Sequence, residues 1–270
     1  MTNSSSSQNE QPRRKRPPPR PVTVTRVETV APRLTRVTFG GERLADFGPP
    51  KPGAHIKLLF VPEGVRWNPE DPDDPDDPTP RPPSRTYTPR RYDRDACELD
   101  VEFVHHGGGL ASDWAVRAQP GDPMFIGGPG GGYDIPADAK KIVLVADETS
   151  MPAAGMILES LPPGCTAEVL CEVRDGDDER RLSEAVAATP RWLHRAAGND
   201  RAGTLLQHAV RDIAGANTDS YWWVACESAA MRRIRDYLRD EAGIAADSVH
   251  TRGYWKLGEE NYPDHDYGKD

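Results

Sequence analysis

The chain has 270 residues, 36% of them hydrophobic, and a formal net charge of −9 at pH 7. This length indicates two domains with modest cores, and the acidic balance argues against nucleic acid as the main partner, because phosphate recognition depends on clustered cations. No stretch approaches the roughly 20 apolar residues that a membrane helix requires, so we expect no membrane span.

The first twenty residues predict a disordered tail. They are rich in Ser, then basic at positions 13–16, then Pro at positions 17–19, and they contain no apolar run that would serve as a signal peptide. The Ser and Pro neighbours favour a solvated tail over a segment that binds nucleic acid or anionic lipid.

The four cysteines form no Cys-x-x-Cys pair, which argues against zinc, iron–sulfur and thioredoxin-like centres. Three of them fall in apolar runs that read as strands, which is typical of buried thiols in a reducing cytoplasm. We therefore expect a cytoplasmic protein without a metal site, whose redox chemistry would come from an organic cofactor. Motifs of serine hydrolases, nucleotide triphosphatases and zinc proteases are absent from the sequence.

Residues 21–135 predict a small antiparallel β-barrel of the Greek-key type. Short runs with strand character recur between Gly and Pro residues, and the third and fifth alternate clearly between apolar and polar positions. The runs cover residues 22–27, 34–39, 54–60, the segment around 85, 97–103 and 124–126. Residues 67–83 form an acidic, Pro-rich insert, which we interpret as a solvated spacer.

Arg85, Thr86, Tyr87 and Thr88 lie at the end of the fourth predicted strand. Because side chains alternate along a strand, Arg85 and Tyr87 are expected on one face and the two Thr residues on the other. A guanidinium can hold a pyrophosphate bidentately, beside a ring that lies on a flavin and a Thr that bonds the flavin edge. An edge strand with one surface arginine is the alternative.

A glycine run at 107–109, between His106 and the pair Ala111 and Ser112, is a second candidate phosphate site. Glycine lets backbone N–H groups approach an anion, and Ser112 is expected to cap a short helix that begins there. His105 is expected on the other face of the strand. The alternative is a Gly-rich turn without a ligand.

The glycines at 127–132 precede a strand and do not follow one, so we interpret them as a domain linker and not as a phosphate loop. From residue 136 to residue 270 the pattern predicts a doubly wound parallel sheet, with its ligands at the carboxyl ends of the strands. The predicted strands are 141–146, 167–173, 192–193, 221–226 and 249–254, and the predicted helices are 151–161, 204–213 and 229–241.

The first strand of this sheet leads into Asp147-Glu148-Thr149 and lacks a Gly-x-Gly-x-x-Gly turn. Two carboxylates at a helix N-terminus would repel a pyrophosphate, so a nicotinamide dinucleotide would not be held there in the usual Rossmann manner.

Several blocks together resemble the siderophore-interacting proteins, the FAD-dependent ferric-siderophore reductases of the ferredoxin-reductase-like superfamily. The resemblance runs from about Val22 to the C-terminus, and the ordered set is far more specific than any one block. The blocks are Arg85–Thr88, and residues 104–115, 146–153, 192–195, 223–228 and 253–258.

The resemblance implies an FAD held between barrel and sheet, with no catalytic side chain. The cofactor contacts that it implies are Arg85, Tyr87, Thr88, His106, Gly109, Ala111, Ser112, Asp147, Thr149 and Trp255. Ferric siderophore would meet the cations Arg195, Arg252 and Lys256. Arg195 is also a candidate for reading a ribose 2′-phosphate.

The resemblance further implies that NADH, NADPH or reduced ferredoxin supplies electrons and that Fe(III) in a siderophore receives them. Reduction releases the metal, because hard anionic oxygen ligands hold Fe(III) far better than Fe(II). Two alternatives share parts of this prediction: a general NAD(P)H-flavin or ferredoxin-type reductase, and a non-catalytic siderophore-binding module, which would purify without colour.

Overall fold

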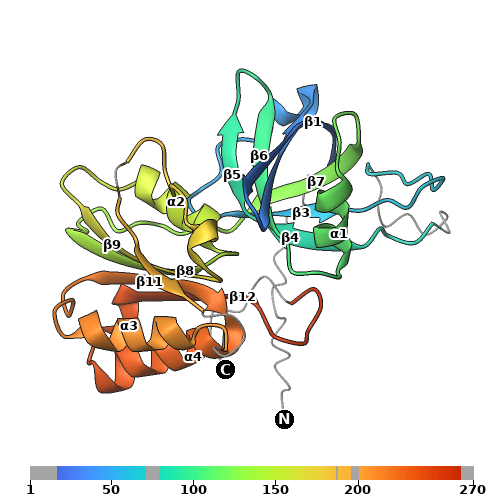
Figure 1. Cartoon of the computed structure of the whole chain (residues 1–270). Coiled ribbons are helices and arrows are strands. Elements are labelled where there is room, and N and C mark those ends of the chain that lie inside the picture. The colour runs from blue at the N-terminus through green and yellow to red at the C-terminus, as the bar shows by residue number, and fades with distance from the viewer. Residues whose placement is uncertain (1–16, 71–78, 187, 196–200, 263–270) are drawn as a thin grey trace, which may run out of the picture.

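The computed structural model describes residues 17–70, 79–186, 188–195 and 201–262. Two sheets make up the described chain, and Figure 1 shows them side by side, the N-terminal one in blue to green and the C-terminal one in yellow to red. The first is antiparallel and the second is parallel, so the predicted pair of a barrel domain and a doubly wound domain is confirmed.

Seven strands form the N-terminal sheet: β1 (Arg20–Ala31), β2 (Leu34–Gly40), β3 (His55–Leu59), β4 (Ser84–Tyr87), β5 (Pro89–Asp93), β6 (Glu98–Val104) and β7 (Pro123–Gly130). A short turn, η1 (Glu42–Leu44), and the helix α1 (Leu110–Arg117) join them. The order is β4-β3-β7-β1-β2-β6-β5, and Thr88 alone separates the two edge strands in the chain, so the sheet closes into a barrel. Its core includes the fully buried Phe39, Leu58, Phe103 and Ile126.

Strand β5 and the end of β7 depart from the predicted pattern. The β5 sequence Pro-Arg-Arg-Tyr-Asp does not alternate between apolar and polar residues. Its charged side chains contact other elements, as Arg90 does with Glu159 of α2. The segment Gly127–Gly130, which we predict as a linker, continues β7 beside β3. Glycine permits this pairing, because a Cβ added at Gly130 would lie 3.1 Å from the ring of His55.

Two residues that the sequence assigns to the tail and to the insert pack into the barrel. Arg20, placed in the disordered tail by composition, begins β1, is 8% exposed and donates to two backbone carbonyl groups of the barrel. Trp67, the first residue of the predicted insert, is also buried, with its ring centroid 5.2 Å from that of Phe125. Residues 1–16 and 71–78 lie outside the described residues.

Five parallel strands form the C-terminal sheet in the order β10-β9-β8-β11-β12. Residues Ile142 and Leu144 of β8 face α2, while Val143 and Val145 face α3 and α4, so helices cover both faces as predicted. The elements are β8 (Lys141–Asp147), α2 (Met151–Glu159), β9 (Thr166–Val173), η2 (Gly176–Asp178), β10 (Arg191–His194), α3 (Thr204–Ala214), β11 (Tyr221–Glu227), α4 (Ser228–Asp236), η3 (Tyr237–Glu241), η4 (Ala246–Ser248) and β12 (Val249–Trp255).

Arginine pairs cross between the two halves. Each uses a side chain of one half and a carboxylate of the other, and the buried members have little water to compete with them. The pairs are Arg33 with Asp175 and Asp178 at 2.6 and 2.7 Å, Arg90 with Glu159 at 2.8 Å, and Arg180 with Glu102 at 2.8 Å. They fix the walls of the space between barrel and sheet.

Candidate functional site

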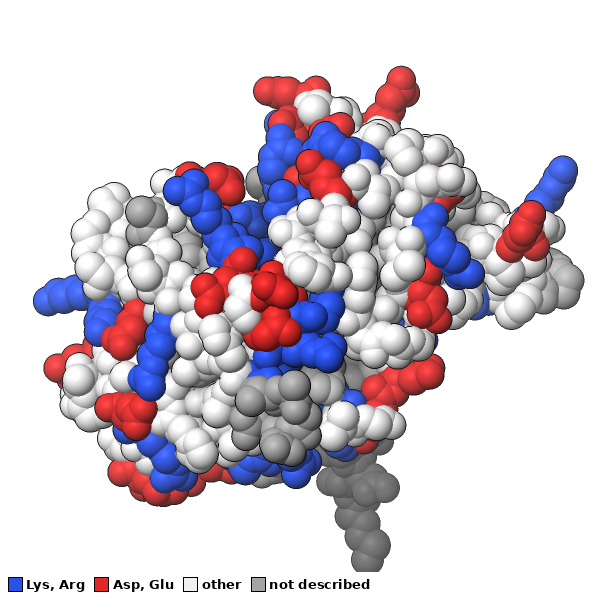
Figure 2. Space-filling view, in the orientation of Figure 1, with Lys and Arg blue, Asp and Glu red and all other residues white. Residues whose placement is uncertain are grey.

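A cavity of about 770 Å³ lies between the two halves, a volume within the usual range for cofactor sites. The barrel contributes the ends of β4 and β6 and the start of α1, while the sheet contributes the carboxyl ends of β8, β9 and β12 and the loop 256–262. Figure 2 shows Lys, Arg, Asp and Glu side chains gathered along the seam between the halves.

All four residues of the segment Arg85–Thr88 line this cavity, and the Thr86 hydroxyl accepts a hydrogen bond from Lys57 Nζ at 2.6 Å. Strand β4 ends at Tyr87, and Thr88 lies at the corner between β4 and β5. The Tyr87 ring packs 4.5 Å from the Phe103 ring, between centroids, and burial raises the pKa of its hydroxyl well above the ordinary value of 10.0. Tyr87 therefore presents a neutral, fixed aromatic ring.

Arg85 keeps most of its hydrogen-bonding capacity toward the cavity. Its side chain is 21% exposed, Nη1 donates to the Ser84 carbonyl at 3.1 Å, and Nη2 lies 3.5 Å from the carboxylate of Glu260. Glu260 is 84% exposed, so this pair is weakly held. An anionic ligand can therefore replace Glu260 at little cost.

The glycine run leads into α1, whose first turn faces the cavity. Gly109 precedes this helix at φ 119, and a Cβ there would lie 3.1 Å from the His106 ring, so glycine is needed. The predicted cap is wrong: Ser112 lies inside the first turn, and the start of α1 has no side-chain cap. Its free N–H groups, together with Ala111 and Ser112 on the cavity wall, suit an anion.

His105 also lines the cavity, contrary to the expectation that it faces away. The alternation fails because β6 ends at Val104, one residue earlier. Burial and the neighbouring His106 lower the pKa of His105 below its ordinary value of 6.5. Its Nε2 is buried and has no hydrogen-bond partner among the described residues.

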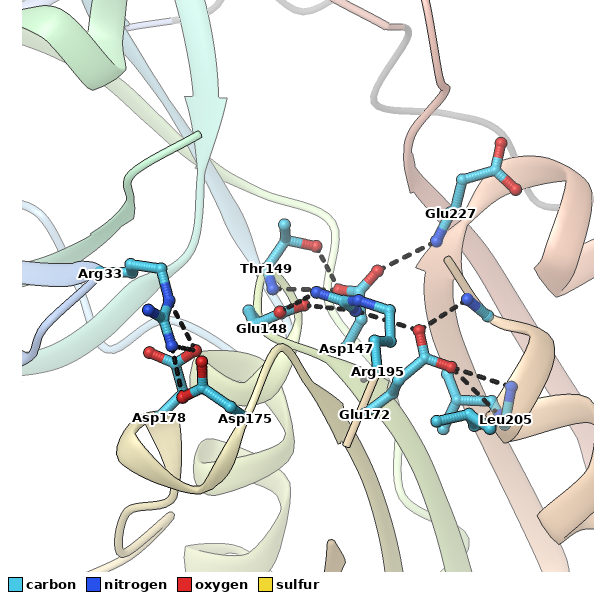
Figure 3. A network of polar contacts seen from close by, with 12 residues as sticks. Arg33, Asp147, Glu148, Thr149, Glu172, Asp175, Asp178, Arg195, Leu205 and Glu227 are labelled. Atoms are coloured by element: carbon cyan, nitrogen blue, oxygen red, sulfur yellow. Dashed lines mark hydrogen bonds and ion pairs between the residues drawn. The ribbon is translucent and has the colours of Figure 1, made fainter. Parts of the chain in front are cut away.

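Asp147 lies beneath the cavity and does not line it. The side chain is 2% exposed and accepts four hydrogen bonds: from the Thr149 N–H and hydroxyl at 3.0 and 2.6 Å, from the Glu227 N–H at 3.1 Å, and from Trp255 Nε1 at 2.8 Å. These four donors occupy the acceptor positions of the carboxylate, so the predicted cofactor contact of Asp147 would need one of them to be displaced. Asp147 positions Thr149 and Trp255, which do line the cavity. Figure 3 shows its contacts with Thr149 and Glu227.

Two further carboxylates fill helix N-termini in the sheet domain. Glu172 is fully buried and accepts from the N–H groups of Gly203, Leu205 and Leu206 at 2.7, 3.1 and 3.3 Å, at the start of α3. Glu227 accepts from the Ala230 N–H at 2.8 Å and caps α4. These helix ends therefore have no room for a ligand phosphate.

The three predicted substrate cations line the cavity, but each already has a partner. Arg195 is paired with Glu148 and with Glu172, and these contacts raise its pKa above the ordinary value (Figure 3). Arg252 is 6% exposed; it donates to the Gly53 carbonyl at 3.3 Å and lies 3.1 Å from His55 Nδ1, so it joins the two halves. The exposed Lys256 is paired with Glu259.

Sequence reasoning missed several cavity residues that carry no motif. Their role depends on contacts between the halves, which no local pattern reveals. These residues are Arg33, Arg174, Asp178, Arg180, Glu259, Glu260 and Tyr262. Within the described ranges, no group of three or more His, Cys, Asp and Glu side chains could hold a metal, and none of the described helices is long and apolar enough to cross a bilayer.

Family models, curated relatives and a solved structure all relate this chain to siderophore-interacting proteins and ferric reductases. Residues 139–258 match the model of the siderophore-interacting protein family, and residues 4–133 match that of the siderophore-interacting FAD-binding domain. The chain is 37% identical to an NADPH-dependent ferric-chelate reductase of Escherichia coli, over 87% of this chain and 92% of that protein. It is 32% identical to the ferric vibriobactin reductase ViuB of Vibrio cholerae, over 89% and 90%. A solved siderophore utilization protein from T. fusca has a TM-score of 0.78 and 31% identity, over 93% of this chain and 98% of that one.

Proposed function

The chain belongs to the siderophore-interacting protein family, and from this premise we propose that it is an FAD-dependent reductase of ferric siderophores. Electrons would come from NADH, NADPH or reduced ferredoxin, and the reaction would serve iron acquisition in the cytoplasm. The observation that carries the proposal is the cavity itself, in which the barrel residues Arg85–Thr88 and His106–Ser112 face the carboxyl ends of the parallel strands.

The barrel wall fits the two ends of a flavin nucleotide. Arg85 offers a partly exposed guanidinium with one weakly held partner, and the uncapped start of α1 offers N–H groups beside Gly109. Both favour a pyrophosphate. Tyr87 offers a neutral ring for the flavin face. Thr88, the next residue, also lines the cavity, and its side chain is hydrogen-bonded to Tyr254.

The sheet wall supplies positioning and not acid–base chemistry. Trp255 is held in place by its hydrogen bond to Asp147, and Thr149 is held by the same carboxylate. When bound, FAD accepts two electrons from a hydride donor and passes them on singly to ferric iron. The protein residues hold the cofactor and the substrate, exclude water and leave the reacting atoms free of protein nucleophiles.

We propose that the ferric chelate, the substrate, binds near Lys256 and Arg252. Ferric siderophores carry anionic oxygen ligands, and Lys256 is exposed at the rim of the cavity with a pair to the exposed Glu259. An anionic chelate can replace Glu259 there, since exposed pairs contribute only about 0–1 kcal/mol. Arg252 is buried and contacts both halves, so it would attract the anionic chelate from below the rim of the cavity.

The absorption spectrum of the purified protein, taken before and after anaerobic addition of NADH, NADPH or reduced ferredoxin, tests the cofactor and the donor. The proposal predicts a bound flavin that one of these donors bleaches and a ferric siderophore restores, with Fe(II) trapped by a ferrous-specific chelator. A protein that takes up no FAD would be the non-catalytic module, and one that reduces free flavin but no ferric chelate would be a general flavin reductase. Either result contradicts the proposal.

A further inference from the structure

The segment that follows β12 runs along the cavity between the two halves. All seven of its residues, 256–262, line that cavity. In Figure 1 this segment is the red loop that leaves β12 and lies below the barrel. We call residues 256–262 the strap. The strap continues the last strand of the sheet domain, yet it forms a wall of a cavity that the barrel shares, so its position sets how open the cavity is.

Both ends of the strap are attached to the sheet domain. Just before it, Trp255 Nε1 donates to the buried carboxylate of Asp147 at 2.8 Å. At its other end, the hydroxyl groups of Tyr262 and Ser228 are hydrogen-bonded at 2.8 Å, and Ser228 is the first residue of α4. Any movement of the strap that keeps these bonds therefore concerns the residues between its two ends.

The middle of the strap is exposed and is held together by its own contacts. Leu257 is 62% exposed, which is unusual for a large apolar side chain. The Glu259 N–H donates to the Lys256 carbonyl at 3.0 Å, and the side chains of these two residues form an ion pair. Because these contacts lie within the strap, its middle can move as a unit between the fixed ends.

The strap reaches the barrel through Glu260. Its carboxylate lies 3.5 Å from Arg85 Nη2, and Arg85 belongs to β4 of the barrel. A guanidinium binds carboxylate and phosphate oxygens with the same planar set of N–H groups. One side of Arg85 therefore cannot hold Glu260 and a diphosphate at the same time.

We propose that the strap is an autoinhibitory gate, in which Glu260 takes the place of the cofactor diphosphate at Arg85 until the cofactor arrives and releases the middle of the strap from the barrel. This inference rests on the proposed function, because that function assigns Arg85 to the diphosphate. The Glu260 side chain is exposed, and an exposed pair changes an equilibrium by up to about fivefold. The gate therefore slows the entry of the cofactor without preventing it.

Cleavage by trypsin after Lys256 reports the release of the strap without any turnover. Limited proteolysis follows the population of the open form when opening is fast, and mass spectrometry identifies the cut between Lys256 and Leu257 in the full chain freed of flavin. ADP carries the diphosphate without the flavin, and riboflavin carries the flavin ring without a phosphate. We expect ADP to speed this cut about two- to fivefold, and riboflavin to leave its rate unchanged.

Glu260→Gln should give the faster cut without any ligand and should no longer respond to ADP. The variant should also bind FAD with an association rate about two- to fivefold higher and an unchanged dissociation rate, because the pair exists only in the free protein. Arg85→Ala removes the other half of the pair and should give the same fast cut. The matched control is Glu63→Gln, an exposed barrel position outside the cavity lining, which should change neither rate.

Three results would overturn the gate. The first is a cut after Lys256 that ADP leaves unchanged or slows. The second is a wild-type rate of cutting in both Glu260→Gln and Arg85→Ala. The third is a Glu260→Gln variant in which the dissociation rate of FAD changes and the association rate does not, because the strap would then act on the bound cofactor and not in its place.

The two proposals fail in different ways. A protein that binds FAD and reduces ferric siderophores, but whose strap does not respond to ADP, keeps the reductase function and loses the gate. A protein whose strap is released by ADP through Glu260, but which reduces no ferric chelate, keeps the gate for a nucleoside diphosphate and loses the reductase function.

Discussion

Replacing Asp147 with Asn removes the carboxylate that accepts four hydrogen bonds beneath the cavity. Burial, with the nearby charge of Glu148, raises the pKa of Asp147 from 3.8 to about 6, against the opposing hydrogen bonds from Thr149 and Trp255. The folded protein therefore binds this proton more tightly than the unfolded chain does. The contribution to stability is complete below pH 3.8 and is lost as the pH rises through 6.

The size of the effect follows from the two pKa values. Their difference corresponds to about 3 kcal/mol in total, and integration between pH 5 and pH 8 gives a loss of about 1.4 kcal/mol. Asp147→Asn has no proton to lose. The free energy of unfolding of the wild type, minus that of the variant, should therefore fall by about 1.4 kcal/mol over this range. This change comes on top of a constant cost, because each carboxylate oxygen accepts from two donors and the Asn NH2 group leaves one such pair without an acceptor.

Urea unfolding at several pH values, followed by tryptophan fluorescence, measures this difference. Asp219→Asn, at an exposed position, is the control and should follow the wild type at every pH. A difference that stays constant or grows with pH would refute the reasoning. It would mean that the four donors outweigh burial and hold the pKa of Asp147 at or below its ordinary value.

Three further predictions concern the same cavity and the sheet domain. Arg85→Ala should weaken FAD binding about 10- to 100-fold, because a charge-assisted pair with the pyrophosphate is lost. Equilibrium titration with FAD measures this change. The control is Arg91→Ala, on the exposed side of β5, which should leave FAD binding unchanged. Glu260→Gln should tighten FAD binding by up to about fivefold, since an exposed competitor for Arg85 disappears; weaker binding would contradict this role. Gly203→Ala should cost about 2–4 kcal/mol in thermal unfolding, because the residue has φ +80 and its Cβ would lie 2.2 Å from that of Ala230.

The sequence predicts the strands whose side chains alternate or are all apolar, because those patterns reflect burial on one or both faces. It therefore places β3, β6 and β8 well. Strand β5 is missed because its charged residues are stabilised by ion pairs outside the barrel core, as with Arg90 and Glu159. The glycines at the end of β7 carry no side-chain pattern at all.

The site residues divide in the same way, into those that a local sequence pattern marks and those that it does not. Arg85, Tyr87, His106 and Gly109 belong to motifs and are found from the sequence, and all of them line the cavity. Arg180 belongs to none, because its role depends on a contact with a barrel strand 78 positions earlier in the chain. The surroundings of Asp147 are hidden from the sequence for a related reason. A carboxylate at a strand end looks available until its four donors are known, and these are two groups of Thr149 in the following loop, the Glu227 N–H of β11 and Trp255 Nε1 of β12.

The capping of the helices bears on how the protein folds before any cofactor is bound. The starts of α3 and α4 are satisfied by Glu172 and Glu227, which are fixed in strands, whereas the start of α1 has no side-chain cap. The sheet domain can therefore reach its final local structure during folding without any nucleotide. The N–H groups of the first turn of α1 depend on water as long as no ligand is bound there, so these amide hydrogens should exchange faster than those at the starts of α3 and α4.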